Sequence, residues 1–409
     1  MKYTIAVIGG GAAGLMAALT AAGQGAVVTI WEGKDRLGKK ILSTGNGKCN
    51  FTNLVQKDSC YRGSNPEFSK AAREFFSIDA TLAYFEKIGI LPKVKNGYVY
   101  PNSEQAASVA DALSMEVRAA NISVMKEEVV SVRPKNGHFL VKGSTASFEY
   151  DRVILCMGSC AGMKDGTKFR GYEIVKELGH KVTEVFPALV QMKCREKWFK
   201  TVAGVRTEAK LTLFENGREI ATEQGEVLFA EYGLSGIPVF QISRYAGAAL
   251  LRGSKVTCKV DFFPSTAVEE LKTHLSMRVE NGKTRTAEEI LIGLQNHKLN
   301  YIILKECNIN PVGDSVKEFK SGAVLDKLAK KYKNLECEVT ELNSFANAQI
   351  CAGGADTDEL CDKTMESRLH KGLYMAGELV DIDGTCGGYN LQWAWSSGYT
   401  AGYHAATDR

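Results

Sequence analysis

Apolar residues at the start of the chain fall into two short runs separated by a glycine-rich turn. The first run is Ile5 to Ile8, residues 9–14 are Gly-Gly-Gly-Ala-Ala-Gly, and a stretch rich in Ala and Leu follows. The second run is Val27 to Trp31, and it ends on Glu32. Short apolar runs bounded by glycine are typical of buried strands. The pattern therefore predicts a strand, a tight turn, a helix and a second strand.

This order of elements is the context in which Gly-x-Gly-x-x-Gly indicates dinucleotide binding. Gly9 permits the tight turn, Gly11 lets backbone N–H groups approach a pyrophosphate, and Gly14 lets helix and strand pack closely. The pyrophosphate would lie at a helix N-terminus, where free N–H groups and the helix dipole favour negative charge. Glu32 is placed to accept hydrogen bonds from an adenosine ribose. A purely structural turn is the alternative, and the agreement of all four features favours the dinucleotide.

Two later apolar runs also end on glycine. Residues 153–158 predict a buried parallel strand ending at Gly158, and residues 373–378 predict another that ends on Gly377 and Glu378. A glycine-rich loop and a helix from Leu391 to about residue 405 follow the second run. Backbone can approach a ligand closely where a strand ends on glycine.

The pattern changes from about Gln191 onward. Apolar residues alternate around Leu211 and again around Cys258, and Asn216-Gly217 predicts a hairpin turn, so this region is expected to be antiparallel β-structure. Helices are expected after it, including one that begins with a capping box at residues 286–289 and two near 299–307 and 315–332.

Bulk composition changes this picture little. Of the 409 residues 44% are hydrophobic and 24% charged, and the net charge of +4 neither demands nor excludes a polyanionic partner. The eleven cysteines include no Cys-x-x-Cys pair, which favours free thiols in a reducing cytoplasm. The six histidines are isolated, so no metal site is expected. No apolar run predicts a membrane span, and the protein is expected to be cytoplasmic.

Four segments far apart in the sequence are candidate points of ligand approach: 9–32, 38–50, 153–158 and 377–391. The second is a polar loop rich in Gly, Ser, Thr and Asn, which is either a plain surface loop or a loop around phosphate and flavin. A nicotinamide dinucleotide needs mainly the first segment, whereas the longer FAD uses several. FAD is therefore the expected cofactor. The chain between the last two segments would then form an inserted domain.

These residues also resemble those of a known family. The motifs are residues 45–53 (Gly-Asn-Gly-Lys-Cys-Asn-Phe-Thr-Asn), 225–229 with 233–236, 364–367, and 377–378 through 387–394. Together they resemble the BaiN/YhiN-like flavoproteins, also labelled NAD(P)/FAD-dependent or aminoacetone-oxidase-family enzymes, from residue 4 to residue 403. The chain departs from the family pattern at residues 166–172 and 230–231, and both departures concern the substrate more than the cofactor.

The resemblance implies an α/β protein with non-covalent FAD. Its Rossmann-like FAD-binding domain, of the two-dinucleotide-binding type, would comprise residues 1–190 and 331–409. An inserted antiparallel β-barrel (191–265) and a small helical subdomain (266–330) would complete it. NAD(P)H is expected, if used, only as a transient co-substrate.

By the same resemblance, residues 9–14 and Glu32 hold the ADP part, residues 47–50 lie near the flavin, residues 377–378 near the ribitol, and residues 388–391 at the ring. With the neighbouring approach points, the expected cofactor-binding set is Gly9, Gly11, Ala12, Ala13, Gly14, Glu32, Gly33, Gly38, Lys40, Gly45, Gly47, Lys48, Cys49, Asn50, Val129, Met157, Gly158, Gly377, Glu378, Gly388, Tyr389, Asn390 and Leu391. Cys49, Cys386 and Tyr389 have reactive groups, but each is more simply a packed structural residue, and no catalytic residue is assigned.

Three functions are compatible with these features. The first is a small-molecule oxidoreductase that reduces an activated C=C bond or oxidises a small amine, using NAD(P)H or O₂. The second is a flavin-dependent RNA-modifying enzyme that reduces uridine to dihydrouridine in 23S ribosomal RNA, a reaction to which relatives of this type are linked. The third is a flavin-binding partner protein without turnover. Basic stretches at 164–170, 193–200 and 327–333 are candidates for an RNA-facing surface, although such stretches are more often solvated.

Overall fold

The computed structural model describes residues 2–164, 166–282, 285–313 and 321–408. The chain divides into two compact units, one formed by residues 1–186 and 350–409 and the other by residues 187–349. Each unit has its own buried apolar core. The residues of the expected cofactor site all belong to the first unit.

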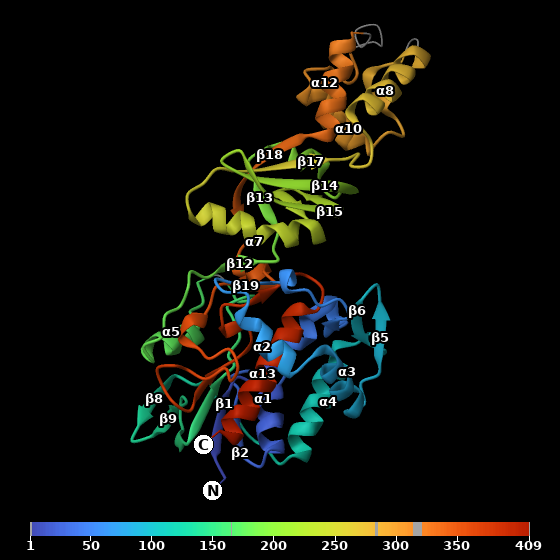
Figure 1. The fold of residues 1–409 in the computed structure, drawn as a ribbon. Helices are drawn as coiled ribbons and strands as arrows, with labels where there is room; N and C mark the ends of the chain where they lie inside the picture. The colour runs from blue at the N-terminus through green and yellow to red at the C-terminus, as the bar shows by residue number, and fades with distance from the viewer. Residues whose placement is uncertain (1, 165, 283–284, 314–320, 409) are drawn as a thin grey trace. The chain divides into compact units, whose positions relative to one another are not determined.

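A five-stranded parallel sheet forms the centre of the first unit (Figure 1). Its strands, in spatial order, are β20 (Leu373–Met375), β11 (Arg152–Leu155), β1 (Thr4–Ile8), β2 (Val27–Trp31) and β7 (Ser123–Met125). Four of the five residues of β1 are buried, because this strand lies in the middle of the sheet and packs on both faces. The expected strands at 5–8, 27–31, 153–155 and 373–375 are therefore neighbours.

Helices pack against this sheet and against one another. α1 (Ala12–Gly23) follows β1 and lies beside the last helix, α13 (Tyr389–Thr407), while α4 (Ala106–Ala119) packs nearby (Figure 1). The remaining helices of this unit are α2 (Phe68–Phe75), α3 (Ile78–Lys87) and α5 (Arg170–Glu177). α2 and α3 are separate helices because Ser77 caps the second, its hydroxyl accepting from the Ala80 N–H at 3.3 Å.

Smaller sheets complete the first unit. They are β8 (Ser131–Lys135) with β9 (His138–Lys142) and β10 (Ser147–Tyr150); β3 (Thr52–Asn53) with β6 (Tyr98–Pro101) and β5 (Pro92–Lys95); and β4 (Tyr61–Arg62) with β21 (Asp383–Gly384). Short 3₁₀ segments are η1 (Lys39–Gly47), η2 (Asp58–Cys60), η4 (Thr357–Glu359) and η5 (Gly377–Leu379). The strands β12 (Phe186–Ala188) and β19 (Ile350–Ala352) lie where the chain leaves the first unit and returns to it.

The second unit combines a closed six-stranded barrel with helices. In barrel order the strands are β13 (Met192–Cys194), β16 (Gly233–Ser235), β15 (Arg218–Ala230), β14 (Arg206–Glu215), β17 (Val256–Asp261) and β18 (Leu335–Leu342). Its helices are α6 (Phe199–Val202), α7 (Ile237–Leu251), α8 (Val268–Gly282), α9 (Ala287–Leu291), α10 (His297–Glu306) and α12 (Gly322–Lys333), with η3 (Phe345–Asn347) near its end.

Local signals in this unit act as the sequence predicts. Asn216 and Gly217 both have positive φ (+49° and +85°) in the turn that joins β14 to β15. Thr286 accepts from the Glu289 N–H at 3.3 Å, and the Glu289 carboxylate accepts from the Thr286 N–H at 2.7 Å, which completes the capping box of α9. The expected helix at 315–332 is α12 from residue 322 onward, and residues 314–320 lie outside the described part.

One boundary differs from the sequence-based expectation. The expected boundary at residue 331 places residues 331–349 in the nucleotide-binding domain, but Leu335 to Leu342 form β18, which pairs with β17 and β13 and closes the barrel. The alternation of buried Leu335, Cys337 and Val339 with polar neighbours fits a barrel strand. The chain therefore returns to the first unit only at about residue 350.

Candidate dinucleotide and redox site

The turn between β1 and α1 depends on its glycines. Gly9 has φ +104°, and a Cβ there would lie 2.5 Å from the Cys156 carbonyl oxygen. A Cβ on Gly14 would lie 1.8 Å from the Gly9 carbonyl oxygen, so helix and strand approach closely only because both positions lack a side chain. Gly11 differs from both, because a Cβ there would meet nothing within 4 Å. The backbone at Gly11 is therefore open on its outer side.

This open side lies at the start of α1. Gly11 is the N-cap residue, and the first turn contains no acidic side chain. The first N–H groups of a helix have no intrahelical acceptor, and the helix dipole adds partial positive charge at this end. Together they form a site for an anion. The residues present fit the pyrophosphate of a dinucleotide.

Glu32 is held beside this turn. One carboxylate oxygen accepts from the Gly10 N–H at 2.8 Å and the other accepts from the Lys34 N–H at 2.7 Å. An ionised carboxylate offers about four acceptor positions, so both oxygens can accept further bonds from ribose hydroxyls. Next to it, Gly33 lies against Glu128, and Val129 is 4% exposed in the segment that leaves β7.

Three separate segments meet at Glu378, the acid that follows β20. Lys40 in η1 forms an ion pair with the Glu378 carboxylate. Ser159, two residues beyond the partly buried Met157 and next to Gly158, donates to Glu378 Oε2 at 3.0 Å. Lys40 Nζ lies 3.5 Å from Ser159 Oγ. Ser159 was not among the expected site residues, and its only signal in the sequence is its place after the glycine that ends a strand.

Backbone contacts join these segments to the glycine turn. The Gly38 N–H donates to the Gly10 carbonyl oxygen at 2.8 Å. A Cβ on Gly377, which has φ +72°, would lie 2.8 Å from Ala13 Cβ. Since β20, β11 and β1 are adjacent parallel strands, their carboxyl ends bring the segments starting at 9, 157 and 377 to one edge of the sheet.

The loop at residues 45–50 forms a second cluster with the start of α13. A Cβ on Gly388, the N-cap of α13 with φ +94°, would lie 2.5 Å from the Thr52 carbonyl oxygen and 3.0 Å from Asn50 Oδ1. Asn53 Nδ2 donates to the Gly387 carbonyl oxygen at 2.9 Å. Gly45 also has positive φ (+55°) and turns the loop so that it passes close to Asn50. The two expected flavin loops are therefore packed together.

Several side chains in this cluster are already engaged. Lys48 forms an ion pair with Glu104 at 2.8 Å. The Asn390 amide binds Gly384 with both its atoms, accepting from the N–H at 2.7 Å and donating to the carbonyl oxygen at 2.9 Å. The Tyr389 hydroxyl donates to the Val55 carbonyl oxygen at 2.9 Å. These contacts shape the loop around Gly47, where a Cβ would meet nothing within 4 Å, the buried Gly387, where a Cβ would lie 2.7 Å from the Tyr98 ring, and the half-buried Leu391.

Burial keeps the reactive groups of this cluster neutral. It raises the pKa of the Cys49 thiol to about 12, against a small opposing effect from Thr44. Burial also raises the pKa values of Cys386 and Tyr389. None of the three is poised to exchange a proton near pH 7, which fits structural roles.

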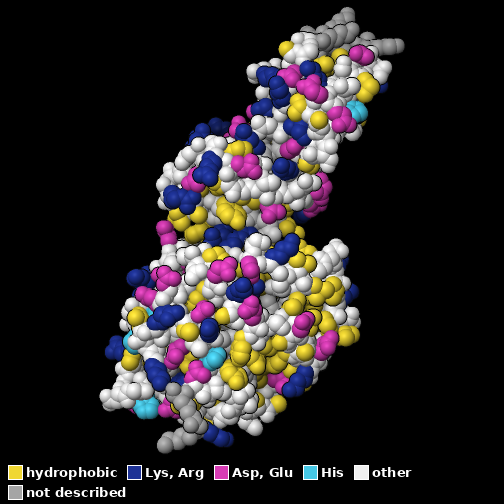
Figure 2. Space-filling model, viewed as in Figure 1, with side chains coloured by type: hydrophobic (Ala, Val, Ile, Leu, Met, Phe, Trp, Pro, Cys, Tyr) yellow, Lys and Arg dark blue, Asp and Glu magenta, His cyan; other side chains and the backbone are white. Residues whose placement is uncertain are grey.

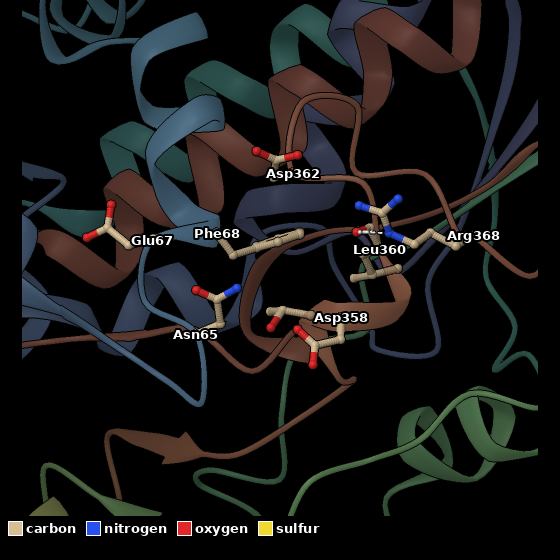
Figure 3. Close-up of a pocket in the computed structure, with 8 residues that line it drawn as sticks. Asn65, Glu67, Phe68, Asp358, Leu360, Asp362 and Arg368 are labelled. Atoms are coloured by element: carbon tan, nitrogen blue, oxygen red, sulfur yellow. Dashed lines mark hydrogen bonds between the residues drawn. The ribbon is translucent and has the colours of Figure 1, made fainter.

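A separate cavity of about 360 Å³ lies in the first unit (Figure 3). It is lined by Asn65, Glu67, Phe68, Thr357, Asp358, Leu360, Asp362 and Arg368. Arg368 Nε donates to the Leu360 carbonyl oxygen at 2.9 Å, as the dashed line in Figure 3 shows. The cavity includes none of the expected cofactor residues.

Among the described residues, no cluster of His, Cys, Asp and Glu has the arrangement of a metal site. Within the same residues, no helix combines the length and apolarity that crossing a bilayer requires.

Fold and site together define a Rossmann-type FAD-binding protein with a barrel-containing second unit, which confirms the expected fold class. Residues 3–404 match the family model described as HI0933-like protein Rossmann domain, and the chain belongs to this family. The resemblance to BaiN/YhiN-like flavoproteins is thereby confirmed.

Two relatives match over nearly their whole length. The 3-dehydro-bile acid delta(4,6)-reductase of Clostridium scindens is 39% identical over 98% of this chain and 98% of its own length. The ribosomal RNA dihydrouridine synthase of Haemophilus influenzae is 28% identical over 96% of each chain. Among solved structures, 3-ketosteroid delta1-dehydrogenase from Sterolibacterium denitrificans covers 100% of both chains with a TM-score of 0.48 and 11% identity.

Proposed function

We propose that this protein is an FAD-dependent oxidoreductase that reduces a C=C bond conjugated to a ketone in a steroid-like small molecule. The 39% identity to a bile acid delta(4,6)-reductase, over 98% of both chains, supports the substrate class. The convergence of the four expected segments at one sheet edge and its adjoining loops supports the cofactor.

The proposed FAD is held without covalent attachment. The N-terminus of α1 at Gly11 binds the pyrophosphate, Glu32 accepts from the ribose of the adenosine, and the Lys40–Ser159–Glu378 group binds polar atoms farther along the cofactor. The cluster of residues 45–50 with 387–391 encloses the flavin ring. Bound FAD supplies two-electron redox chemistry that no side chain of the protein provides.

The names of the two relatives point to one reaction type. A delta(4,6)-reductase saturates C=C bonds of a 3-oxo steroid, and forming dihydrouridine saturates a C=C bond conjugated to a carbonyl of the uracil ring. In both cases the carbonyl activates the double bond toward hydride. The two relatives therefore support reduction of a C=C bond, and neither supports oxidation of an amine.

Reduction of uridine in ribosomal RNA is the second candidate function, supported by the 28% identical relative. An RNA substrate requires cationic side chains free to contact phosphates. In the three expected basic stretches, however, Arg170 pairs with Glu173 and Lys193 with Glu341. Lys333 likewise pairs with Asp261 at 2.8 Å. Figure 2 shows basic and acidic side chains interspersed on the visible face. These pairings leave fewer cations for RNA phosphates, and the 39% identity to the bile acid reductase favours the small molecule.

The decisive experiment incubates the purified yellow protein anaerobically with a 3-oxo steroid carrying 4,5 and 6,7 double bonds, with NADH or NADPH as proposed reductant. We expect a product heavier by two hydrogens for each bond reduced, and free FAD in the supernatant after denaturation.

Ribosomal RNA from a deletion strain should keep its dihydrouridine content. Loss of dihydrouridine without steroid reduction would replace the proposal by the RNA function. Turnover of neither would leave a flavin-binding partner protein, and release of FMN would contradict the cofactor.

A further inference from the structure

Two cysteines far apart in the sequence have their sulfur atoms in contact in the first unit. Cys160 lies in the loop after β11, and Cys351 lies in β19. Their Sγ atoms are 3.4 Å apart. A disulfide bond is about 2.05 Å long, so the two sulfur atoms need to move together by only about 1.4 Å to form one.

The two thiols differ in the way that a redox-active pair requires. Cys351 is 5% exposed, whereas Cys160 is only half-buried and can be reached by a small molecule. The contact with Cys351 is the main cause that lowers the pKa of Cys160; a backbone hydrogen bond and the Lys40 ammonium add to it, against the opposing effect of burial. The same contact, followed by burial, raises the pKa of Cys351. The accessible thiol is thus the more acidic one, and a thiolate is the nucleophile in disulfide exchange.

The surroundings of the pair add polar groups that suit this chemistry. Ser159 precedes Cys160 and donates to Glu378, whose partner is Lys40. The Tyr172 hydroxyl is buried and has no hydrogen-bond partner among the described residues. Burial, and then the two thiols, raise its pKa, so Tyr172 stays protonated.

We propose that Cys160 and Cys351 form a redox-active dithiol that is oxidised to a disulfide by low-molecular-weight disulfides. The Cys160 thiolate attacks one sulfur of the small disulfide, which forms a mixed disulfide and releases one small thiolate. Cys351 then loses its proton and attacks the Cys160 sulfur, which closes the internal disulfide and expels the second small thiolate. The two protein thiols lose two electrons and two protons, and the small disulfide gains them as two thiols.

This inference does not depend on the proposed function, because the reaction uses only protein thiols and the added disulfide. The redox state of the pair is nevertheless linked to the proposed cofactor site. Closing the bond displaces the residue next to Ser159, whose hydroxyl binds Glu378. The strand β19 carries Cys351, so the disulfide would also tie the loop after β11 to the strand by which the chain re-enters this unit.

The test equilibrates the full-length purified protein with oxidised and reduced glutathione at a series of ratios, followed by acid quenching, alkylation and peptide mass analysis. We expect one cross-linked species, two hydrogens lighter, that joins the peptides of Cys160 and Cys351, and its amount should follow the glutathione ratio. The wild-type protein alone gives this result, so the test does not require any variant to fold.

Matched variants identify the partners. Cys160→Ser should abolish the cross-link and leave Cys351 alkylated. Cys351→Ser should instead accumulate a mixed disulfide between Cys160 and glutathione. Cys194→Ser is the control, because Cys194 belongs to a different cysteine contact, 3.8 Å from Cys337, in the second unit. It should keep the Cys160–Cys351 cross-link unchanged. Full alkylation of both cysteines at every glutathione ratio, or a cross-link that joins other cysteines, would overturn the proposal.

Discussion

Gly11 faces open space at the start of α1, and this makes it the sharpest test of the phosphate site at the scale of one residue. A carboxylate there would find room in the fold, because a Cβ meets nothing within 4 Å, but it would repel a pyrophosphate. We expect Gly11→Asp to fold and to lose at least tenfold in FAD affinity, about 1.4 kcal/mol or more. Absorbance of bound flavin after gel filtration measures the occupancy.

Gly11→Asn is the control, since its side chain has nearly the same size without the charge. It separates electrostatic repulsion from steric block, and we expect it to retain more FAD than the aspartate variant. Normal FAD occupancy in Gly11→Asp would show that the glycine turn is not the phosphate site.

His180 makes a second prediction at this scale. Its side chain is fully buried, with Nδ1 3.0 Å from a Glu359 oxygen and Nε2 2.8 Å from Ser367 Oγ. The Ser367 oxygen already accepts from the N–H groups of Leu369 and His370, so the Ser367 hydroxyl donates its proton to Nε2. The ring proton is then on Nδ1, which donates to Glu359. Burial lowers the pKa of His180 in spite of Glu359.

A lowered folded-state pKa means that the unfolded chain binds the proton first as the pH falls. Stability from this group is therefore complete above the ordinary pKa of 6.5 and declines as the pH falls below it, by at most about 1.4 kcal/mol per pH unit. Urea unfolding at a series of pH values gives the free energy of unfolding at each pH. Below pH 6.5 this free energy should fall less steeply with decreasing pH for His180→Gln than for the wild type. His274→Gln, whose ring is 53% exposed, should keep the wild-type slope. Equal slopes in all three proteins would contradict the assignment.

At the scale of elements, the pairing of α13 with α1 depends on two glycines one helical turn apart. A Cβ on Gly398 would lie 2.4 Å from the Ala13 carbonyl oxygen, and one on Gly402 would lie 2.3 Å from that of Ala17. The obstructing atoms are backbone, which cannot move aside as a side chain would. The close packing brings the start of α1 next to Gly377 and so positions the phosphate site.

We expect Gly402→Ala to lower the free energy of unfolding by about 1–3 kcal/mol, because the helices must separate to admit one methyl group. Gly23→Ala is the matched control: it lies in α1, is exposed, and a Cβ there meets nothing within 4 Å. The control should be neutral or more stable by up to about 1 kcal/mol. Urea titration followed by circular dichroism measures both, and an unchanged Gly402→Ala would contradict the packing argument.

At the scale of the whole molecule, the two units have separate hydrophobic cores. Leu15 in the first and Leu211 in the second are both fully buried. We expect Leu15→Ala and Leu211→Ala each to destabilise its own unit by about 2–5 kcal/mol, through lost burial and the cavity left behind. Calorimetry should resolve two transitions, with each variant lowering a different one. A single transition lowered equally by both variants would show that the units unfold together.

The strand-turn-helix at the start of the chain was predictable because its chemistry is local. A glycine that must adopt positive φ, an apolar strand and an acid at the end of the next strand lie within some thirty residues, and each restricts the backbone directly. The same holds for the turn at Asn216-Gly217 and the capping box at Thr286, where the side chain that makes the structure adjoins the backbone that needs it.

Only the tertiary structure decided which segments far apart in the sequence contact each other, because the local preferences of one segment carry no information about another. The meeting of Lys40 and Ser159 with Glu378, and the contact of Cys160 with Cys351, each follow from the order of parallel strands and their loops, and no spacing along the chain encodes them. The place of β18 in the barrel is of the same kind, because an alternating strand fits several sheets equally well until its partners are formed. Local sequence therefore determined the elements and the dinucleotide turn, whereas long-range pairing determined which side chains share a site.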